Sequence, residues 1–298
     1  MKVYVVIVTF NGMKWIEKCL NSVTSSQLKC EIVVVDNGSS DGSKKFIREN
    51  FREVYFIQSE KNIGFGAANN IGITKAMQAN ADYVFLLNQD AWIEENTIAE
   101  LVKTAQQHPE YGIISPVHLN GSYTALDVKF SEYIIPQRCP DFVSDIYLNK
   151  LKSVYEIEFV NAAAWLISSL CIKKTGLFEP MFFLYGEDDN YLQRVEYYNF
   201  KTGISPSCTI CHDREIRKED RNKTGSKLWN RTQSLIMLLD IRRSYSKSIL
   251  FFSRQTLYSF FKSIKDKNPG GIMILFSEFF FLIKNFYTLK KRRSSMKQ

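Results

Sequence analysis

Short apolar runs alternate with amphipathic stretches through the first 120 residues of the chain. The apolar runs lie at residues 3–9, 31–36, 54–58, 83–88 and 113–117. Each run is apolar on both faces, which predicts strands of a parallel sheet with helices on both sides. The segments between them have helical spacing and lie at residues 14–23, 43–50, 66–80 and 94–107. This alternation predicts an α/β fold, with a doubly wound and mostly parallel sheet flanked by helices.

The pattern changes twice further along the chain. Residues 119–158 show no clear periodicity, and we interpret them as an irregular insertion. Regular patterns then predict a strand at 159–168, a helix at 188–199 and a strand at 203–211. Residues beyond 227 are helical in pattern, with a break at the Asn-Pro-Gly-Gly sequence 268–271. The longest apolar run of this tail, 272–283, contains Glu278 and is shorter than the roughly 20 residues of a spanning helix, so we expect no membrane span.

Charge divides the chain into an acidic body and a basic tail. Residues 1–212 carry 19 Lys and Arg against 24 Asp and Glu, whereas residues 213–298 carry 20 against 7. Such asymmetry indicates an anionic partner for the tail, either a lipid surface or a nucleic acid. Apolar residues make up 45% of the chain, which excludes wholesale disorder. The six cysteines form no disulfide pattern, and we expect reduced thiols in the cytoplasm.

Polar residues follow the predicted strands at the edge where ligands bind in such sheets. Asp36 opens the sequence Asp-Asn-Gly-Ser-Ser-Asp-Gly-Ser, which is either a capped loop or a site where Asp36 contacts a nucleobase or ribose. Gly64 and Gly66 precede a predicted helix in an incomplete dinucleotide pattern, which favours binding of diphosphate or ribose oxygens at the helix start.

Two acidic sites are candidates for chemistry. Asp90, in Asn88-Gln89-Asp90, follows the most apolar strand, where a carboxylate either caps the next helix or binds Mg²⁺ or Mn²⁺. Glu187, Asp188 and Asp189 follow an aromatic run. They either stabilise a helix start or raise one another's pKa, as a general base requires.

A Cys-x-x-Cys-His sequence closes the last predicted strand. Cys208, Cys211 and His212 match the haem-attachment pattern formally. We reject haem because no export signal is present and the segment alternates like a strand. A zinc site lacks a fourth ligand nearby in the sequence. His212 is therefore either a functional imidazole at a strand end or a structural histidine.

The tail from 241 to 298 interleaves 12 aromatic residues with 13 Lys and Arg and contains only two acids. Aromatic and basic residues at helical spacing are typical of helices that lie in a membrane interface. The closing sequence Lys-Lys-Arg-Arg would strengthen attraction to an anionic leaflet. The alternatives are a helix packed on the body and, without any nucleic-acid motif, a nucleic-acid-binding tail.

Together these motifs resemble those of inverting glycosyltransferases of family 2, which have the GT-A fold, and in particular rhamnosyltransferase-like bacterial members. The matching stretches lie at residues 5–12, 33–42, 62–72, 86–90 and 182–188. The resemblance covers roughly residues 1–215. It implies a catalytic domain at 1–225, with donor-binding half 1–118 and acceptor-side half 119–225, followed by a membrane-associating helical tail at 226–298.

The resemblance also implies roles for single residues. It places a nucleoside-diphosphate sugar on Thr9, Asn11, Asp36, Asn69 and Asn88. It makes Asp90 and His212 ligands of a divalent cation, Mg²⁺ or Mn²⁺, and Asp188 the catalytic base, with Glu187 an acceptor contact or alternative base. Two departures stand out: Asn88 replaces the first Asp of the metal motif, and Asn190 replaces an Asp after the acids.

The implied function is transfer of a sugar from dTDP-rhamnose or a UDP-hexose to a hydroxyl of an oligosaccharide or lipid-linked acceptor. That reaction belongs to cell-surface polysaccharide synthesis, such as O-antigen or capsule, and we expect the enzyme on the cytoplasmic face of an anionic membrane, with no nucleic-acid partner. The competing hypotheses are a nucleic-acid-associated protein that uses the basic tail and a catalytically silent binder of sugar nucleotides.

Overall fold

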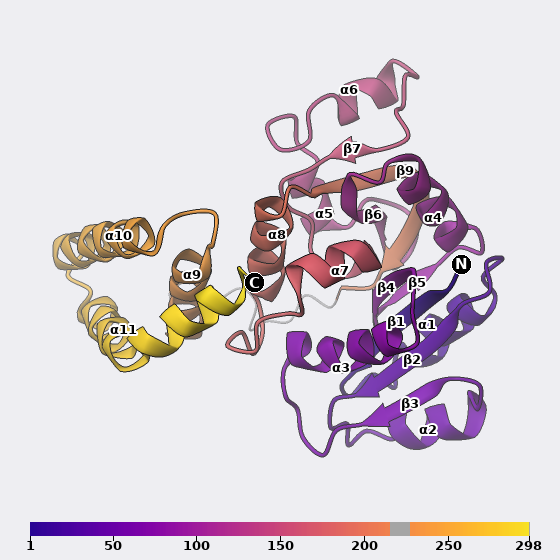
Figure 1. Ribbon diagram of the computed structural model, residues 1–298, viewed down its shortest axis with the longest axis horizontal. Coiled ribbons are helices and arrows are strands. Elements are labelled where there is room, and N and C mark those ends of the chain that lie inside the picture. Colours follow the sequence, from indigo (N-terminus) through magenta and orange to yellow (C-terminus); the bar gives the residue numbers. More distant parts are fainter. Residues whose placement is uncertain (215–226, 298) are drawn as a thin grey trace.

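The structure is a computed structural model that describes residues 1–214 and 227–297. Its centre is one mixed sheet with the strand order β3-β2-β1-β4-β8-β6-β9-β5, and β7 pairs with β9 off this path (Figure 1). The strands are β1 (Val3–Thr9), β2 (Glu31–Asp36), β3 (Tyr55–Gln58), β4 (Tyr83–Asn88), β5 (Ala91–Ile93), β6 (Tyr111–Asn120), β7 (Tyr155–Glu156), β8 (Ala164–Ser168) and β9 (Lys201–His212).

The α/β fold class predicted from the sequence is confirmed, although the sheet is less parallel than expected. Strands β1 to β4 pair in parallel, as do β6 and β9. Strand β8 runs antiparallel to both β4 and β6, and β5 and β7 run antiparallel to β9. These antiparallel strands all follow residue 90, so the regular parallel pairing of β1 to β4 does not extend through the second half of the chain.

Helices cover both faces of the sheet because successive strand residues point to opposite sides. Val6 faces the core formed with α3 (Phe65–Gln78), α7 (Ser169–Thr175) and α8 (Glu187–Tyr197). Val5 and Ile7 face the core formed with α1 (Ile16–Thr24), α2 (Ser43–Asn50) and α4 (Thr97–Gln107). The insertion 119–158 carries two short helices, α5 (Val128–Tyr133) and α6 (Phe142–Tyr147), and strand β7.

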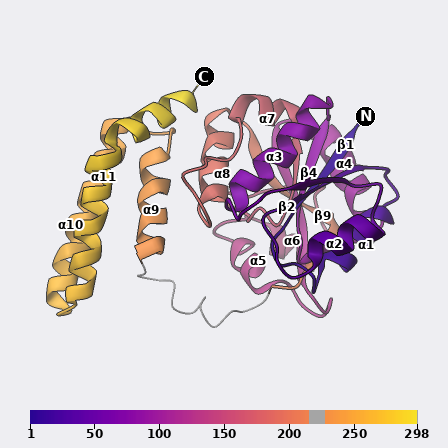
Figure 2. The same ribbon diagram turned by 90° about the horizontal axis from the view of Figure 1, so that it is seen from below.

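Three C-terminal helices form a further layer beside α8. They are α9 (Lys227–Leu239), α10 (Tyr245–Lys265) and α11 (Pro269–Ser295). Figure 2 shows α9 lying between α8 and the pair formed by α10 and α11. Phe182 from the body packs with Leu235, Leu238 and Leu289 of this layer. The expected boundary between residues 225 and 226 lies outside the described residues.

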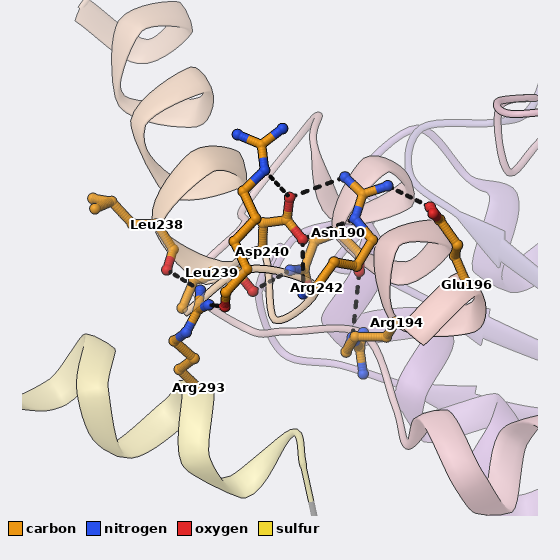
Figure 3. A network of polar contacts seen from close by, with 9 residues as sticks. Asn190, Arg194, Glu196, Leu238, Leu239, Asp240, Arg242 and Arg293 are labelled. Carbon is orange, nitrogen blue, oxygen red and sulfur yellow. Dashed lines mark hydrogen bonds and ion pairs between the residues drawn. The ribbon is translucent and has the colours of Figure 1, made fainter. Parts of the chain in front are cut away.

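Polar contacts connect the helices of this layer with one another and with α8 (Figure 3). Arg242 forms ion pairs with Asp240, at 2.9 Å, and with Glu196 of α8. Within the layer, Arg293 of α11 donates hydrogen bonds to the main-chain oxygens of Leu238, at 2.8 Å, and Arg243. The layer is therefore held to the body by the ion pair of Arg242 with Glu196 as well as by apolar contacts.

Helix α11 is longer than the apolar run on which the expectation of no membrane span rested. It is long and apolar enough to cross a membrane, with a mean hydropathy of 1.5 over an 18-residue window of which 11% is buried. The sequence prediction considered only the 12-residue apolar run 272–283 and therefore excluded a span. An 18-residue window of this helix remains apolar on average although it includes charged residues. Length and composition are the only grounds for a crossing, and Glu278 at mid-helix is buried in an ion pair with Arg231 of α9 at 2.9 Å.

Candidate active site

Strand pairing brings the predicted rim residues to one edge of the sheet. Thr9 at the end of β1 pairs with Asp36 at the end of β2, and Val8 pairs with Asn88 at the end of β4. These strands are parallel, so their carboxyl ends meet at the same edge. The edge is the ligand-binding side that the sequence predicted for such a sheet.

The residues after β1 are held by hydrogen bonds to neighbouring loops. The Thr9 hydroxyl donates to Oε1 of Gln89 at 2.7 Å, and the Phe10 N–H donates to the same oxygen at 2.9 Å. Asn11 has a φ of +50° and its Oδ1 accepts from the Ser40 N–H at 2.8 Å. Gln89 therefore fixes the end of β1, a role that the sequence analysis did not assign to the middle residue of the Asn-Gln-Asp motif.

Asp36 and Asn69 are both buried. The Asp36 carboxylate accepts from the Ser39 N–H at 3.3 and 3.4 Å. Asn69 lies on α3, and its Nδ2 donates to the Phe65 carbonyl of the same helix at 3.0 Å. Neither residue, nor Thr9 or Asn11, lines the cavity that contains the acidic candidates.

The glycines before α3 bring two loops together. Gly64 has a φ of +91°, and a Cβ atom there would lie 2.4 Å from the carbonyl oxygen of Phe183. The Phe65 N–H donates to that same oxygen at 3.2 Å. Gly64 thus permits the start of α3 to contact the loop that precedes the acidic residues of α8.

Asp90 and His212 meet because β5 pairs with β9. The register pairs Ala91 with His212, which places the preceding Asp90 beside the imidazole. The Asp90 Oδ1 atom lies 3.4 Å from Nε2 of His212. His212 is buried and Asp90 is partly exposed, at 24% of its side-chain surface. The structure therefore brings together the two residues that the sequence resemblance assigned to a cation.

Asp127 is a neighbour of His212 that the sequence analysis missed. Its Oδ2 atom lies 3.9 Å from Nδ1 of His212 and 3.2 Å from Nε of Arg214. Its Oδ1 atom accepts from the Phe130 N–H at 2.9 Å and so caps α5. At 3.9 Å this carboxylate is beyond hydrogen-bond distance, and Nδ1 of His212 is buried without a hydrogen-bond partner among the described residues.

Three acidic side chains begin α8, and the pKa of each is raised above its ordinary value. Burial, together with the neighbouring charge of Asp188, raises the pKa of Glu187 to about 8. Burial, with the Asp188 charge, also raises the pKa of Asp189 to about 7. Burial raises the pKa of Asp188 as well. The N–H of Asp189 donates to Asp188 Oδ1 at 3.0 Å, which lowers this pKa in part. Perturbed carboxyl groups of this kind are typical of catalytic sites.

One cavity of about 530 Å³ joins the two acidic sites. It is lined by Asn88, Asp90 and His212 at one place and by Glu187, Asp188 and Asp189 at another. Insertion residues Lys129, Glu132 and Tyr133 form part of its wall, as do Trp229, Thr232, Gln233 and Ile236 of α9. The C-terminal layer therefore contributes directly to the candidate site, which the sequence analysis did not foresee.

Arg194 of α8 and the cysteines of β9 do not line this cavity. Arg194 donates to the carbonyl oxygens of Thr175, at 2.6 Å, and Leu177, at 2.8 Å, so it fixes the end of α7. Cys208 and Cys211 are buried on β9 in different apolar clusters. All six cysteines lie among the described residues and are free, as expected.

A mixed α/β sheet with carboxylates, an imidazole and an acidic helix start around one cavity defines a glycosyltransferase with the GT-A fold. The chain belongs to glycosyl transferase family 2, whose family model matches residues 4–157, just over half of its 298 residues. The resemblance to family 2 stated from the motifs is thereby confirmed, and the rhamnosyltransferase-like subgroup stays a prediction.

Two curated relatives extend beyond the matched domain. Glycosyltransferase GlyA of Streptococcus pneumoniae is 28% identical over 235 residues, which cover 76% of this chain and 32% of that protein. The low-salt glycan biosynthesis hexosyltransferase Agl10 of Haloferax volcanii is 25% identical over 232 residues, which cover 75% of this chain and 69% of that protein. The chain thus spans about a third of the pneumococcal relative.

A solved structure matches almost the whole chain. The mannosyltransferase PcManGT of Pyrobaculum calidifontis, in complex with GDP-Man and Mn²⁺, has a TM-score of 0.60 and 15% identity. The match covers 99% of this chain and 84% of that one. At this identity the likeness establishes a shared fold.

Proposed function

We propose that this protein transfers a sugar from a nucleoside-diphosphate sugar to an acceptor hydroxyl with inversion at the anomeric carbon. The observation that carries the proposal is the single cavity that joins the Asp90–His212 pair to the acids of α8. A diphosphate needs positive charge near it, and an attacking hydroxyl needs a base. The cavity provides a place for each.

Asp188 is the proposed base, and Glu187 is the alternative base or an acceptor contact. Asp188 takes the proton of the acceptor hydroxyl while that oxygen forms a bond to the anomeric carbon. The bond from the anomeric carbon to the diphosphate oxygen breaks, and the diphosphate leaves with the electron pair. A single displacement from the opposite face gives inversion. The raised pKa of these carboxyl groups makes them stronger bases than exposed ones.

A divalent cation fits the donor atoms at the other end of the cavity. The Asp90 carboxylate and Nε2 of His212 face each other, and Asn88 Oδ1 is buried without a hydrogen-bond partner among the described residues. Oxygen donors with an imidazole suit Mg²⁺ or Mn²⁺. Among residues 1–214 and 227–297 no group of three His, Cys, Asp or Glu side chains converges, so phosphate oxygens and water would complete the shell. Such an ion would supply positive charge to the leaving diphosphate.

Thr9, Asn11 and Asp36 are proposed to hold the nucleoside, because they lie at the carboxyl ends of β1 and β2 next to Asn88 and Asp90. Asp36 is proposed to contact the base and Asn69 to border the pocket from α3. Donors that fit the motifs are dTDP-rhamnose and UDP-hexoses, and GDP-mannose is the donor in the solved archaeal complex.

The test of this function is a panel of nucleotide sugars in a thermal-unfolding assay, with and without Mn²⁺. We expect one donor class to raise the melting temperature, and Mn²⁺ to enlarge the increase, because a ligand that binds only the folded state stabilises it. Release of free nucleoside diphosphate in the presence of glycan acceptors then reports turnover. A chain whose melting temperature no nucleotide sugar changes would contradict the proposal.

We further propose that α10 and α11 lie on the anionic cytoplasmic face of a membrane, where the acceptor is lipid-linked and serves cell-surface polysaccharide synthesis. Both helices expose large apolar side chains, including Phe261 at 65%, Phe280 at 66% and Tyr287 at 83%. The tail also carries 13 Lys and Arg against two acids. Anionic lipid fits this surface better than a second copy of the chain, which would present the same positive charge.

Replacing both Phe276 and Phe280 by Ser should release the protein from vesicles of phosphatidylglycerol and phosphatidylcholine. We expect binding to fall at least tenfold, because burying each Phe ring contributes about 1.5–3 kcal/mol. Cosedimentation measures the loss. Tyr147→Ser is the matched control, because Tyr147 is an aromatic residue exposed at 85% on α6, away from the tail. Equal sedimentation of the double variant and the wild type would refute the membrane surface.

A further inference from the structure

A second cavity, of about 820 Å³, adjoins the candidate active site. Its walls come from the insertion around β7, from the exposed face of α8, from the start of β9 and from Arg242 of the C-terminal layer. Phe159 and Asp189 line both cavities. The second cavity thus borders the first at Asp189, and none of Asn88, Asp90 and His212 lines it.

One residue of this wall has an unsatisfied polar atom. Gln193 of α8 is buried, with 9% of its surface exposed, and its Oε1 atom is enclosed and has no hydrogen-bond partner among the described residues. A buried amide oxygen without a partner costs free energy, and a ligand hydroxyl would recover it if the amide turned toward the cavity. Two further polar groups of the wall are exposed: Glu158, and Arg138, which donates to the Glu132 carbonyl at 3.3 Å.

The charge of the wall indicates what kind of ligand fits. Its lining residues include five carboxylates and four cationic side chains, so they are close to neutral in sum. Several are already paired, as in the contacts of Lys201 with Glu156 at 2.7 Å and of Lys152 with Asp141 at 3.0 Å. A phosphate or polyanion would meet as many like charges as opposite ones. A neutral chain rich in hydroxyl groups finds donors, acceptors and the aromatic faces of Phe159 and Tyr155.

We propose that this cavity binds the sugar residues of the acceptor next to the one that is glycosylated, so that the acceptor is an oligosaccharide. The inference rests on the proposed function and names its acceptor class. In an inverting displacement the acceptor approaches from the side opposite to the diphosphate. The second cavity borders Asp189 and not the Asp90–His212 pair, so a chain that extends into it would belong to the acceptor.

The test uses the full chain, fluorescently labelled, on a printed array of neutral bacterial and plant oligosaccharides with UDP and Mn²⁺ present. We expect the wild type to retain some glycans of three or more sugars at least tenfold more strongly than their terminal monosaccharides. Gln193→Ala and Arg138→Ala should each weaken that retention about tenfold, the effect of one lost hydrogen bond in a binding site. Arg138 is exposed, so its variant tests the site even if the Gln193 variant unfolds.

Arg52→Ala and Glu53→Ala are the matched controls, because both residues are exposed between α2 and β3, at the far edge of the sheet. Equal retention of monosaccharides and longer glycans would overturn the proposal. So would unchanged retention by the Arg138 and Gln193 variants, or a wild type that binds a nucleotide sugar and retains no glycan. A wild type that prefers long glycans but binds no nucleotide sugar would instead contradict the proposed function and support this cavity as a glycan site.

Discussion

Replacing Asp188 by Asn should lower the rate of sugar transfer by about 10²–10⁴-fold, the usual contribution of a general base. The amide has nearly the shape of the carboxylate but cannot accept the proton of the acceptor hydroxyl. Asp188 lies at the start of α8 and not at the strand ends proposed to hold the nucleotide, so donor affinity should stay close to that of the wild type. Steady-state kinetics measure the rate, and calorimetric titration with the donor measures the affinity.

Glu187→Gln and Asp189→Asn are the matched comparisons, since each removes one charge from the same acidic cluster. A base acts in its deprotonated form, so kcat/KM should rise with pH and level off above the pKa of the base. If Glu187 were the base, kcat/KM would rise up to about pH 8, and the Glu187→Gln variant would no longer show this rise. An Asp188→Asn variant that keeps its rate within tenfold of the wild type would assign the proton transfer elsewhere.

Replacing Asp90 by Asn, or removing divalent cations with EDTA, should each reduce transfer by about 10²–10³-fold, comparable to the loss of one group that stabilises developing negative charge. The variant loses the one carboxylate that faces Nε2 of His212 in the cavity. Electron paramagnetic resonance of Mn²⁺ in the presence of UDP measures the affinity of the metal independently of turnover. We expect that affinity to fall at least tenfold.

Asp82→Asn is the control for this experiment. Asp82 lies immediately before β4, whereas Asp90 follows its other end, and it accepts a hydrogen bond from the Lys2 N–H at 2.7 Å. Its replacement changes the net charge equally but at the opposite edge of the sheet. Full transfer in EDTA, with Asp90→Asn as active as Asp82→Asn, would exclude a cation held by Asp90.

Local patterns predicted the parallel half of the fold well, because each strand there is a short apolar run between clear helical segments. Strand β5 was missed because Ala91–Ile93 has only three residues and follows Asp90 directly. The reversal of β8 was missed because its buried sequence, Ala-Trp-Leu-Ile-Ser, carries no sign of direction. Strand direction depends on which neighbours pair, and a single apolar run does not encode that.

The candidate site was predicted where one motif supplies a residue and missed where distant segments meet. Asp90 and His212 each end an apolar strand and could be selected from the sequence. Asp127 lies in the irregular insertion, and only the packing of α5 against β6, which pairs with β9, brings it to His212. Gln89 was treated as a spacer because its bond to Thr9 joins residues 80 positions apart.

The part of the cavity wall formed by α9 has a practical consequence for anyone preparing a shortened protein. Sequence similarity alone suggests trimming after the last recognised catalytic motif, near His212, and treating the C-terminal helices as a detachable anchor. Such a fragment would lack Thr232, Gln233 and Ile236, and would open the acidic helix start to bulk water. Low activity in that fragment would then report a missing wall and not a poor catalyst.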